Sequence, residues 1–247
     1  MKESLPLIHG PIRSSRLGRA LVVDVTAPQT NMVVSRDSAL ARSSVLVTTC
    51  AHRIIELSKA GEKLDSIAVA GSSGDPVDHP ALREVTDNLR ALRDKWFGRA
   101  KLCLMTALRD LDSFELRTTV GMYDRVLLEF QWGTAKTFAS MTGEKSTQLG
   151  VLTRQLHGLE QLVVQASFAR GPVDNSSSTE VQSWIKKLLE VRPQEVHILT
   201  GGPVLSPAKA KAGRKSVTST RRQQIAEEVA EKTGIAVTIH EEEPLPV

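Results

Sequence analysis

The residues of this sequence best suited to chemistry form a glycine-rich turn, Gly71-Ser72-Ser73-Gly74-Asp75, directly after a short apolar run. Glycines there would let a ligand approach backbone amides and carbonyls closely, and the acid could pair with an ammonium group. The pattern is neither a GxGxxG motif nor a P-loop. It is equally typical of a simple strand-to-helix turn, with Asp78 as the helix N-cap and Pro80 in the first helical turn.

Other candidate groups are too scattered to define a site. Cys50 and Cys103 have no CxxC context, which argues against a zinc site or a disulfide framework and is typical of a reducing compartment. The six histidines show no metal-ligand spacing, and the sequence contains neither HExxH nor GxSxG. We therefore predict no metal site, and nothing supports hydrolytic catalysis.

Composition is that of an ordinary globular protein. The chain has 247 residues, of which 40% are hydrophobic and 24% are charged, enough to bury the core of one α/β domain. A net charge of +4 permits an anionic partner. Aromatic residues make up only 4% of the chain, which is few for a surface on which nucleic-acid bases could stack. The sequence shows no signal-peptide apolar region and no run of transmembrane length. We expect a cytoplasmic protein with no membrane partner.

The elements that would position the turn alternate along the chain, which predicts βα units with parallel strands. Strands are expected at residues 21–25, 66–70, 101–106, 125–130, 161–168, 195–199 and 235–239. Helices are expected at residues 44–60, 79–96, 111–120, 148–159 and 220–232, and from residue 179 onward, where a capping box is predicted. The inward face of the first helix is predicted to hold Val47, Ala51, Ile54 and either Leu57 or Ser58.

The run Gly-Pro-Ile-Arg-Ser-Ser-Arg-Leu-Gly-Arg at residues 10–19 resembles the opening of one branch of the radical SAM superfamily. In that branch a "GP…SRRLGRSLG" segment leads into the first barrel strand, and a C-x3-C-x2-C loop follows. The three cysteine positions fall here on Asn31, Ser35 and Ser38. A set with no thiolate holds a four-iron cluster poorly. The resemblance therefore implies the scaffold of these enzymes, with the 4Fe-4S cluster absent and the adenosyl radical lost.

Later strand ends extend the resemblance. Residues 71–80 resemble the family's "SGSGEPTLHP" segment, whose turn receives the amino group of S-adenosylmethionine (SAM), with Asp75 in place of glutamate. Thr106 is kept from a "TNGSLL" segment, and Gln131 replaces the acid of "SLDA" that helps to hold SAM. The family's "RPP" segment falls on residues 201–203, Gly-Gly-Pro, so its arginine is missing here. The resemblance implies a ligand site at Gly71, Ser72, Ser73, Gly74, Asp75, Thr106 and Gln131.

The resemblance covers residues 10–239 and implies an α/β fold, a partial (β/α)6 TIM-like barrel with mostly parallel strands. Periodicity alone leaves a doubly wound sheet open. In either fold the functional face lies at the carboxyl ends of the strands. We expect one domain over residues 1–240 and a frayed acidic tail over residues 241–247.

The expected function is that of a degenerate radical SAM-like protein, a pseudoenzyme without radical catalysis. It would bind a nucleoside-like ligand such as SAM, or a protein partner, at the former SAM face. The alternative is an RNA-associated protein that uses two basic groups, although a solvated surface explains these charges more simply. The groups consist of Arg13, Arg16, Arg19, Lys209, Lys211, Arg214, Lys215, Arg221 and Arg222. A radical SAM enzyme with non-standard cluster ligands is less expected, because Cys50 and Cys103 fall outside the ligand loop.

Overall fold

The computed structural model describes residues 6–28, 34–35, 38–201, 213 and 215–241. The chain divides into two compact units. Unit 1 contains residues 1–106, 113–126 and 243–247, and unit 2 contains residues 107–112 and 127–242. The expectation of one domain over residues 1–240 stays a prediction. Residues 242–247 of the expected frayed tail lie outside the described residues.

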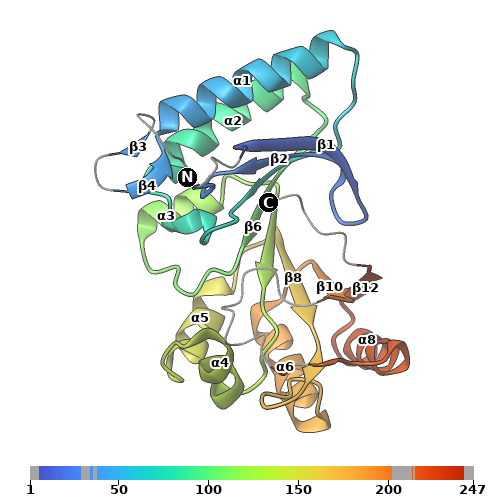
Figure 1. Cartoon of the computed structure of the whole chain (residues 1–247). Helices are drawn as coiled ribbons and strands as arrows, with labels where there is room; N and C mark the ends of the chain where they lie inside the picture. The colour runs from blue at the N-terminus through green and yellow to red at the C-terminus, as the bar shows by residue number, and fades with distance from the viewer. Residues whose placement is uncertain (1–5, 29–33, 36–37, 202–212, 214, 242–247) are drawn as a thin grey trace. The chain divides into compact units, whose positions relative to one another are not determined.

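Unit 1 is built on four strands (Figure 1). They are β1 (Ile8–Ser14), β2 (Gly18–Asp24), β5 (Ser66–Ala70) and β6 (Lys101–Thr106). β1 and β2 form an antiparallel hairpin, whereas β2, β5 and β6 are parallel. In register, Val22 lies beside Ala68, which lies beside Cys103. β5 is buried along its whole length, as expected of a parallel strand covered on both faces.

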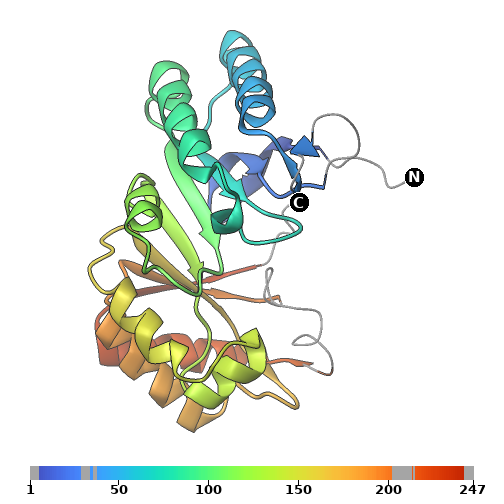
Figure 2. The same ribbon diagram turned by 90° about the vertical axis from the view of Figure 1, so that its left-hand side faces the viewer.

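Two long helices lie side by side on the strands of unit 1, α1 (Ser43–Lys59) and α2 (Leu82–Trp96) (Figure 2). The short elements η1 (Pro76–Asp78) and α3 (Phe114–Val120) complete the described helical part of this unit. The buried face of α1 consists of Leu46, Cys50, Ile54 and Leu57, so the predicted stripe was wrong by one position at its first two residues. Both stripes are apolar, and only packing against α2 and the sheet selects between them.

Unit 2 repeats the βα alternation, and its strands are β7 (Arg125–Glu129, which begins in unit 1), β8 (Leu162–Ser167), β10 (Glu195–Leu199) and β12 (Ala236–His240). β8, β10 and β12 are parallel and in register. Four helices lie on one side of them (Figure 2). These are α4 (Ala135–Thr142), α5 (Gln148–Leu156), α6 (Ser178–Val191) and α8 (Ser219–Thr233).

The long strands follow the hydrogen-bonded order β1-β2-β5-β6-β7-β8-β10-β12. Two short antiparallel pairs stand apart, β3 (Val34–Ser35) with β4 (Ser38–Ala41), and β9 (Ala169–Arg170) with β11 (Lys215–Ser216). The predicted mostly parallel α/β fold is confirmed, and the strands expected at residues 66–70, 101–106 and 195–199 are found there. Two of the longer elements, β1 and α4, were missed, and so were the short elements β3, β4, η1, β9 and β11. No helix in the described part of the chain is long and apolar enough to cross a membrane.

Candidate functional site

The glycine-rich turn at residues 71–75 leaves the carboxyl end of β5. Gly71 is buried, and a Cβ atom there would lie 2.2 Å from the carbonyl oxygen of Gly74 and 2.6 Å from Oγ1 of Thr26. Only glycine therefore fits the start of the turn. The next three residues, Ser72, Ser73 and Gly74, are exposed, and a Cβ atom on Gly74 would meet no atom within 4 Å. The turn is thus tight on its inner side and accessible on its outer side.

Asp24, the acid at the end of β2, fixes the turn through hydrogen bonds. Asp24 is fully buried, and its Oδ1 atom accepts hydrogen bonds from the backbone N–H groups of Thr26 at 3.0 Å and Ser72 at 3.1 Å. The Thr26 hydroxyl accepts in turn from the N–H of Ser73 at 3.1 Å. The second carboxylate oxygen of Asp24, Oδ2, is buried and has no hydrogen-bond partner among the described residues.

The structure brings Asp75 and Thr106 together, although the sequence separates them by a helix and a strand. The Thr106 hydroxyl donates to Oδ1 of Asp75 at 2.7 Å, and the N–H of Val77 donates to the same atom at 3.1 Å. Asp75 is therefore the N-cap of η1. Asp78 was predicted as an N-cap, which is wrong, because α2 begins at Leu82 and Ala81 precedes it without a side-chain cap.

His79 has a structural explanation in the same unit. Its Nδ1 atom accepts a hydrogen bond from the N–H of Ala81 at 3.2 Å, so Nε2 carries the proton and donates to the carbonyl oxygen of Ala41 at 3.1 Å. The ring is buried, with 4% exposed. It joins the start of α2 to β4 and is not a candidate base.

Gln131 lies in unit 2, after the end of β7. Its side-chain oxygen accepts from the N–H of Ser167 at 3.1 Å and from the Ser167 hydroxyl at 2.7 Å, while its nitrogen donates to Glu129 at 2.6 Å. Asn175 extends this cluster by donating to the carbonyl oxygens of Gln131 and Ser167. The amide of Gln131 is therefore held by internal hydrogen bonds.

The residues at the expected cluster positions do not fit an iron–sulfur cluster. Asn31 lies outside the described residues, and Ser35 and Ser38 pair with each other across β3 and β4. The two cysteines are fully buried in α1 and β6, and burial raises the pKa of each thiol to about 12. Such thiols resist forming the thiolates that a cluster requires. Among the described residues no group of three histidine, cysteine or acidic side chains could hold a metal ion.

Several residues of the basic groups make local contacts. Arg19 forms an ion pair with Glu62, and Arg16 is buried. Arg221 donates to the carbonyl oxygen of Ser176 at 2.8 Å. Lys209, Lys211, Arg214 and residues 202–203 of the expected "RPP" segment lie outside the described residues.

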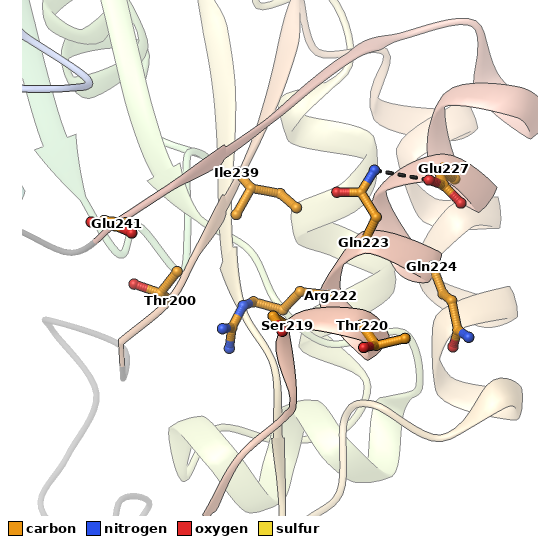
Figure 3. A pocket seen from close by; sticks show the side chains of 9 residues that line it. All are labelled: Thr200, Ser219, Thr220, Arg222, Gln223, Gln224, Glu227, Ile239 and Glu241. Atoms are coloured by element: carbon orange, nitrogen blue, oxygen red, sulfur yellow. Dashed lines mark hydrogen bonds between the residues drawn. The ribbon is translucent and has the colours of Figure 1, made fainter.

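A pocket of about 640 Å³ lies beside the start of α8 (Figure 3). Arg222 lines it and donates to the carbonyl oxygen of Val217 at 2.7 Å. Glu227 and Glu241 line the same pocket, so its charge is mixed rather than basic. This mixture does not favour the phosphate backbone of a nucleic acid.

Comparison with known proteins identifies the fold. No family model and no curated protein matches the sequence. Among solved structures, a radical SAM methyltransferase from Sphaerobacter thermophilus matches with a TM-score of 0.60 at 14% identity, over 91% of this chain and 67% of that one. A domain of pyruvate-formate lyase-activating enzyme from Bacteroides vulgatus matches with a TM-score of 0.53 at 13% identity, over 70% of this chain and 98% of that one.

SuiB of Streptococcus suis, in a structure bound to S-adenosylmethionine, matches with a TM-score of 0.57 at 11% identity. The match covers 80% of this chain and 43% of SuiB. Identities this low establish the fold and no more. The chain has the fold of radical SAM enzymes, and the predicted partial TIM-like barrel of the α/β class is confirmed.

Proposed function

We propose that this chain is a radical SAM-like protein without cluster ligands, and that it binds a nucleoside-type ligand such as SAM at the glycine-rich turn. The observation that carries the proposal is the convergence of polar groups from three strand ends of unit 1. Asp24 follows β2, the turn with Asp75 follows β5, and Thr106 ends β6. Ligands of α/β proteins bind at such carboxyl ends.

The chemistry of these groups fits the amino-acid portion of SAM. The Asp75 carboxylate would attract the ammonium group, and the buried Oδ2 atom of Asp24 offers a further acceptor. The exposed backbone of Ser72, Ser73 and Gly74 lets a ligand approach without steric hindrance. The sulfonium of SAM would supply an activated alkyl group. No radical step is proposed, since the cysteines are buried away from the strand-end loop.

Gln131 remains a proposed contact. Its amide already bonds to Glu129 and Ser167, so a ligand would have to replace one of these hydrogen bonds. For this reason the proposal assigns most of the binding free energy to unit 1, and it predicts that Gln131→Ala weakens binding less than a change at Asp75.

The test is calorimetric titration of SAM into the purified protein, with a thermal-melting shift as the second readout. A ligand that binds only the folded state at a hundredfold excess over its Kd stabilises by about 2.7 kcal/mol. Asp75→Asn keeps the acceptor oxygen for Val77 and Thr106 but removes the charge. We expect it to weaken SAM binding about tenfold, or about 1.4 kcal/mol.

The matched control is Asp78→Asn, which removes an exposed carboxylate three positions away and should bind SAM as the unaltered protein does. S-adenosylhomocysteine, methionine and adenosine distinguish which part of the ligand is recognised. Absence of any heat or melting shift with millimolar SAM would disprove the proposal, and equal affinities for Asp75→Asn and the unaltered protein would disprove the site.

The RNA-associated alternative stays a prediction that no described contact favours, because Arg221 and Arg222 are engaged with backbone carbonyls. Its test is the slope of RNA affinity against salt concentration, which should be steep for phosphate contacts.

A further inference from the structure

The strand order ends on two very different strands. β1 carries Pro11, an exposed Arg13 and a register shift between His9 and Ile12. Proline, charge and an irregular register are the features with which proteins stop an edge strand from pairing further. β12, at the other end, has the sequence Ala-Val-Thr-Ile-His and none of these features. It is a regular, uncharged strand with three β-branched residues.

The open side of β12 can be deduced from a single hydrogen bond. The N–H of Thr200, just after β10, donates to the carbonyl oxygen of His240 at 3.0 Å, so His240 turns its backbone toward β10. Backbone groups of successive residues in a strand alternate in direction. The N–H and C=O groups of Val237 and Ile239 therefore point to the opposite side, where no strand in the described part of the chain pairs with them.

The neighbouring helix α8 has an uneven charge distribution. Arg221 and Arg222 lie in its first turn, whereas Glu227, Glu228 and Glu231 lie in its second half, with Lys232 after them. This order opposes the helix dipole, which favours acids at the start. It suits an antiparallel helix of the same sequence, because each basic end then meets an acidic end. Figure 3 shows Arg222 and Glu227 on the side of α8 near Ile239 of β12.

We propose that β12 is the interface for a second copy of this chain, which adds its own β12 in antiparallel orientation about a two-fold axis. An axis at Thr238 pairs every residue of both strands and lets Val237 exchange both backbone hydrogen bonds with Ile239 of the second copy. Thr238 is exposed and would face Thr238 of the second copy, a favourable pair of hydroxyls. The features of β1 that oppose pairing stop the assembly at two copies.

The proposal is independent of ligand binding and is tested by the oligomeric state in solution. Sedimentation velocity over a series of protein concentrations should show a reversible dimer. Thr238→Lys places two like charges opposite each other across the axis, and Val237→Pro removes an N–H from the open side without removing a bond to β10. We expect each to raise the dimer dissociation constant at least tenfold, or about 1.4 kcal/mol.

Thr48→Lys is the matched control, because it adds the same charge at an exposed position of α1 and should dimerise like the unaltered protein. Far-ultraviolet circular dichroism and the melting temperature verify that each variant is folded, and Thr238→Lys alone suffices if Val237→Pro fails this test. A protein that is monomeric at every concentration overturns the proposal, as does a dimer whose dissociation constant is the same in the control and in Thr238→Lys.

Discussion

In unit 2 the Glu180 carboxylate accepts hydrogen bonds at both oxygens, whereas in unit 1 the Asp24 carboxylate has one buried oxygen without a hydrogen-bond partner among the described residues. In unit 2, Glu180 near the start of α6 accepts hydrogen bonds from the N–H groups of Gly133 at 3.0 Å and Thr134 at 3.2 Å. It also accepts from the hydroxyls of Thr134 and, at 2.7 Å, Thr137. Both carboxylate oxygens are thus occupied, and they fix the start of α4.

In unit 1, Asp24 is also buried, but only one of its two carboxylate oxygens accepts hydrogen bonds from the described residues. Oδ1 accepts three hydrogen bonds from Thr26 and Ser72, while Oδ2 accepts none from the described residues. Leaving a buried acceptor unsatisfied costs about 1–3 kcal/mol. The Glu180 network avoids this cost, because both of its carboxylate oxygens accept hydrogen bonds. The two buried acids therefore differ in how fully they are hydrogen-bonded, and this difference supports the proposal that Asp24 contacts a ligand.

Among the variants that test this comparison, Glu180→Gln is expected to lose the most stability. The N–H groups of Gly133 and Thr134 can only donate, and the two threonine hydroxyls would have to reorient to accept from the amide nitrogen of glutamine. We expect the free energy of unfolding to fall by about 3 kcal/mol, the scale on which hydrogen bonds to a buried charge are lost. Urea denaturation followed by tryptophan fluorescence measures it, since Trp184 lies one turn along the same helix.

Glu190→Gln is the control for Glu180. It lies on the same helix, and its ion pair with Lys187 is exposed, so the change should be below about 1 kcal/mol. If both variants lost the same small amount of stability, the closed network of unit 2 would be of no importance for folding, and the contrast with Asp24 would disappear.

An intermediate loss of stability is expected from an alanine substitution at the start of the glycine-rich turn. Gly71→Ala forces a methyl group against the Gly74 carbonyl and Thr26, so the turn must open. We expect a loss of about 1–3 kcal/mol of stability, the usual cost of overpacking, together with loss of SAM binding. Gly74→Ala meets open space and should leave stability within about 0.5 kcal/mol.

Chemical denaturation and SAM titration on the same two samples check this prediction. Unchanged SAM affinity in a folded Gly71→Ala variant would mean that the turn does not contact the ligand. A large loss of stability in Gly74→Ala would mean that the outer side of the turn is not open.

Patterns within short windows predicted most of the fold. Strands at residues 66–70, 101–106 and 195–199 stand out as apolar runs, and α2 follows its stripe of Leu82, Val85 and Leu89. Asp75 and Thr106 were both predicted at the ligand face, and they do meet through a hydrogen bond. Such features are visible because each depends on residues close in the chain, or on a family pattern that spans them.

Features that depend on distant partners were not predictable. Asp24 ends an apolar strand, and only its hydrogen bond with Ser72, on the loop after the neighbouring strand, connects it to the glycine-rich turn. A capping box was predicted from Thr179, but the N-cap of α6 is Ser177, whose hydroxyl accepts from the N–H of Glu180 at 3.4 Å. Several Ser and Thr residues in that segment could cap equally well by sequence, and the bonds of Glu180 to the loop before α4 select the actual start.

A small effect on stability is expected from Asp24→Asn, and this variant distinguishes the roles of Asp24 and Glu180 most clearly. The amide oxygen can still accept from Thr26 and Ser72, while the amide group removes a buried negative charge from the side where no described residue bonds. A buried neutral amide costs less than a buried unpaired charge, so we expect the free energy of unfolding to change by less than about 1 kcal/mol or to rise. SAM binding should weaken nonetheless, because the acceptor at Oδ2 has become a donor. Denaturation and calorimetry measure the two quantities separately. If Asp24→Asn lost as much stability as Glu180→Gln and bound SAM normally, Asp24 would be a second structural acid.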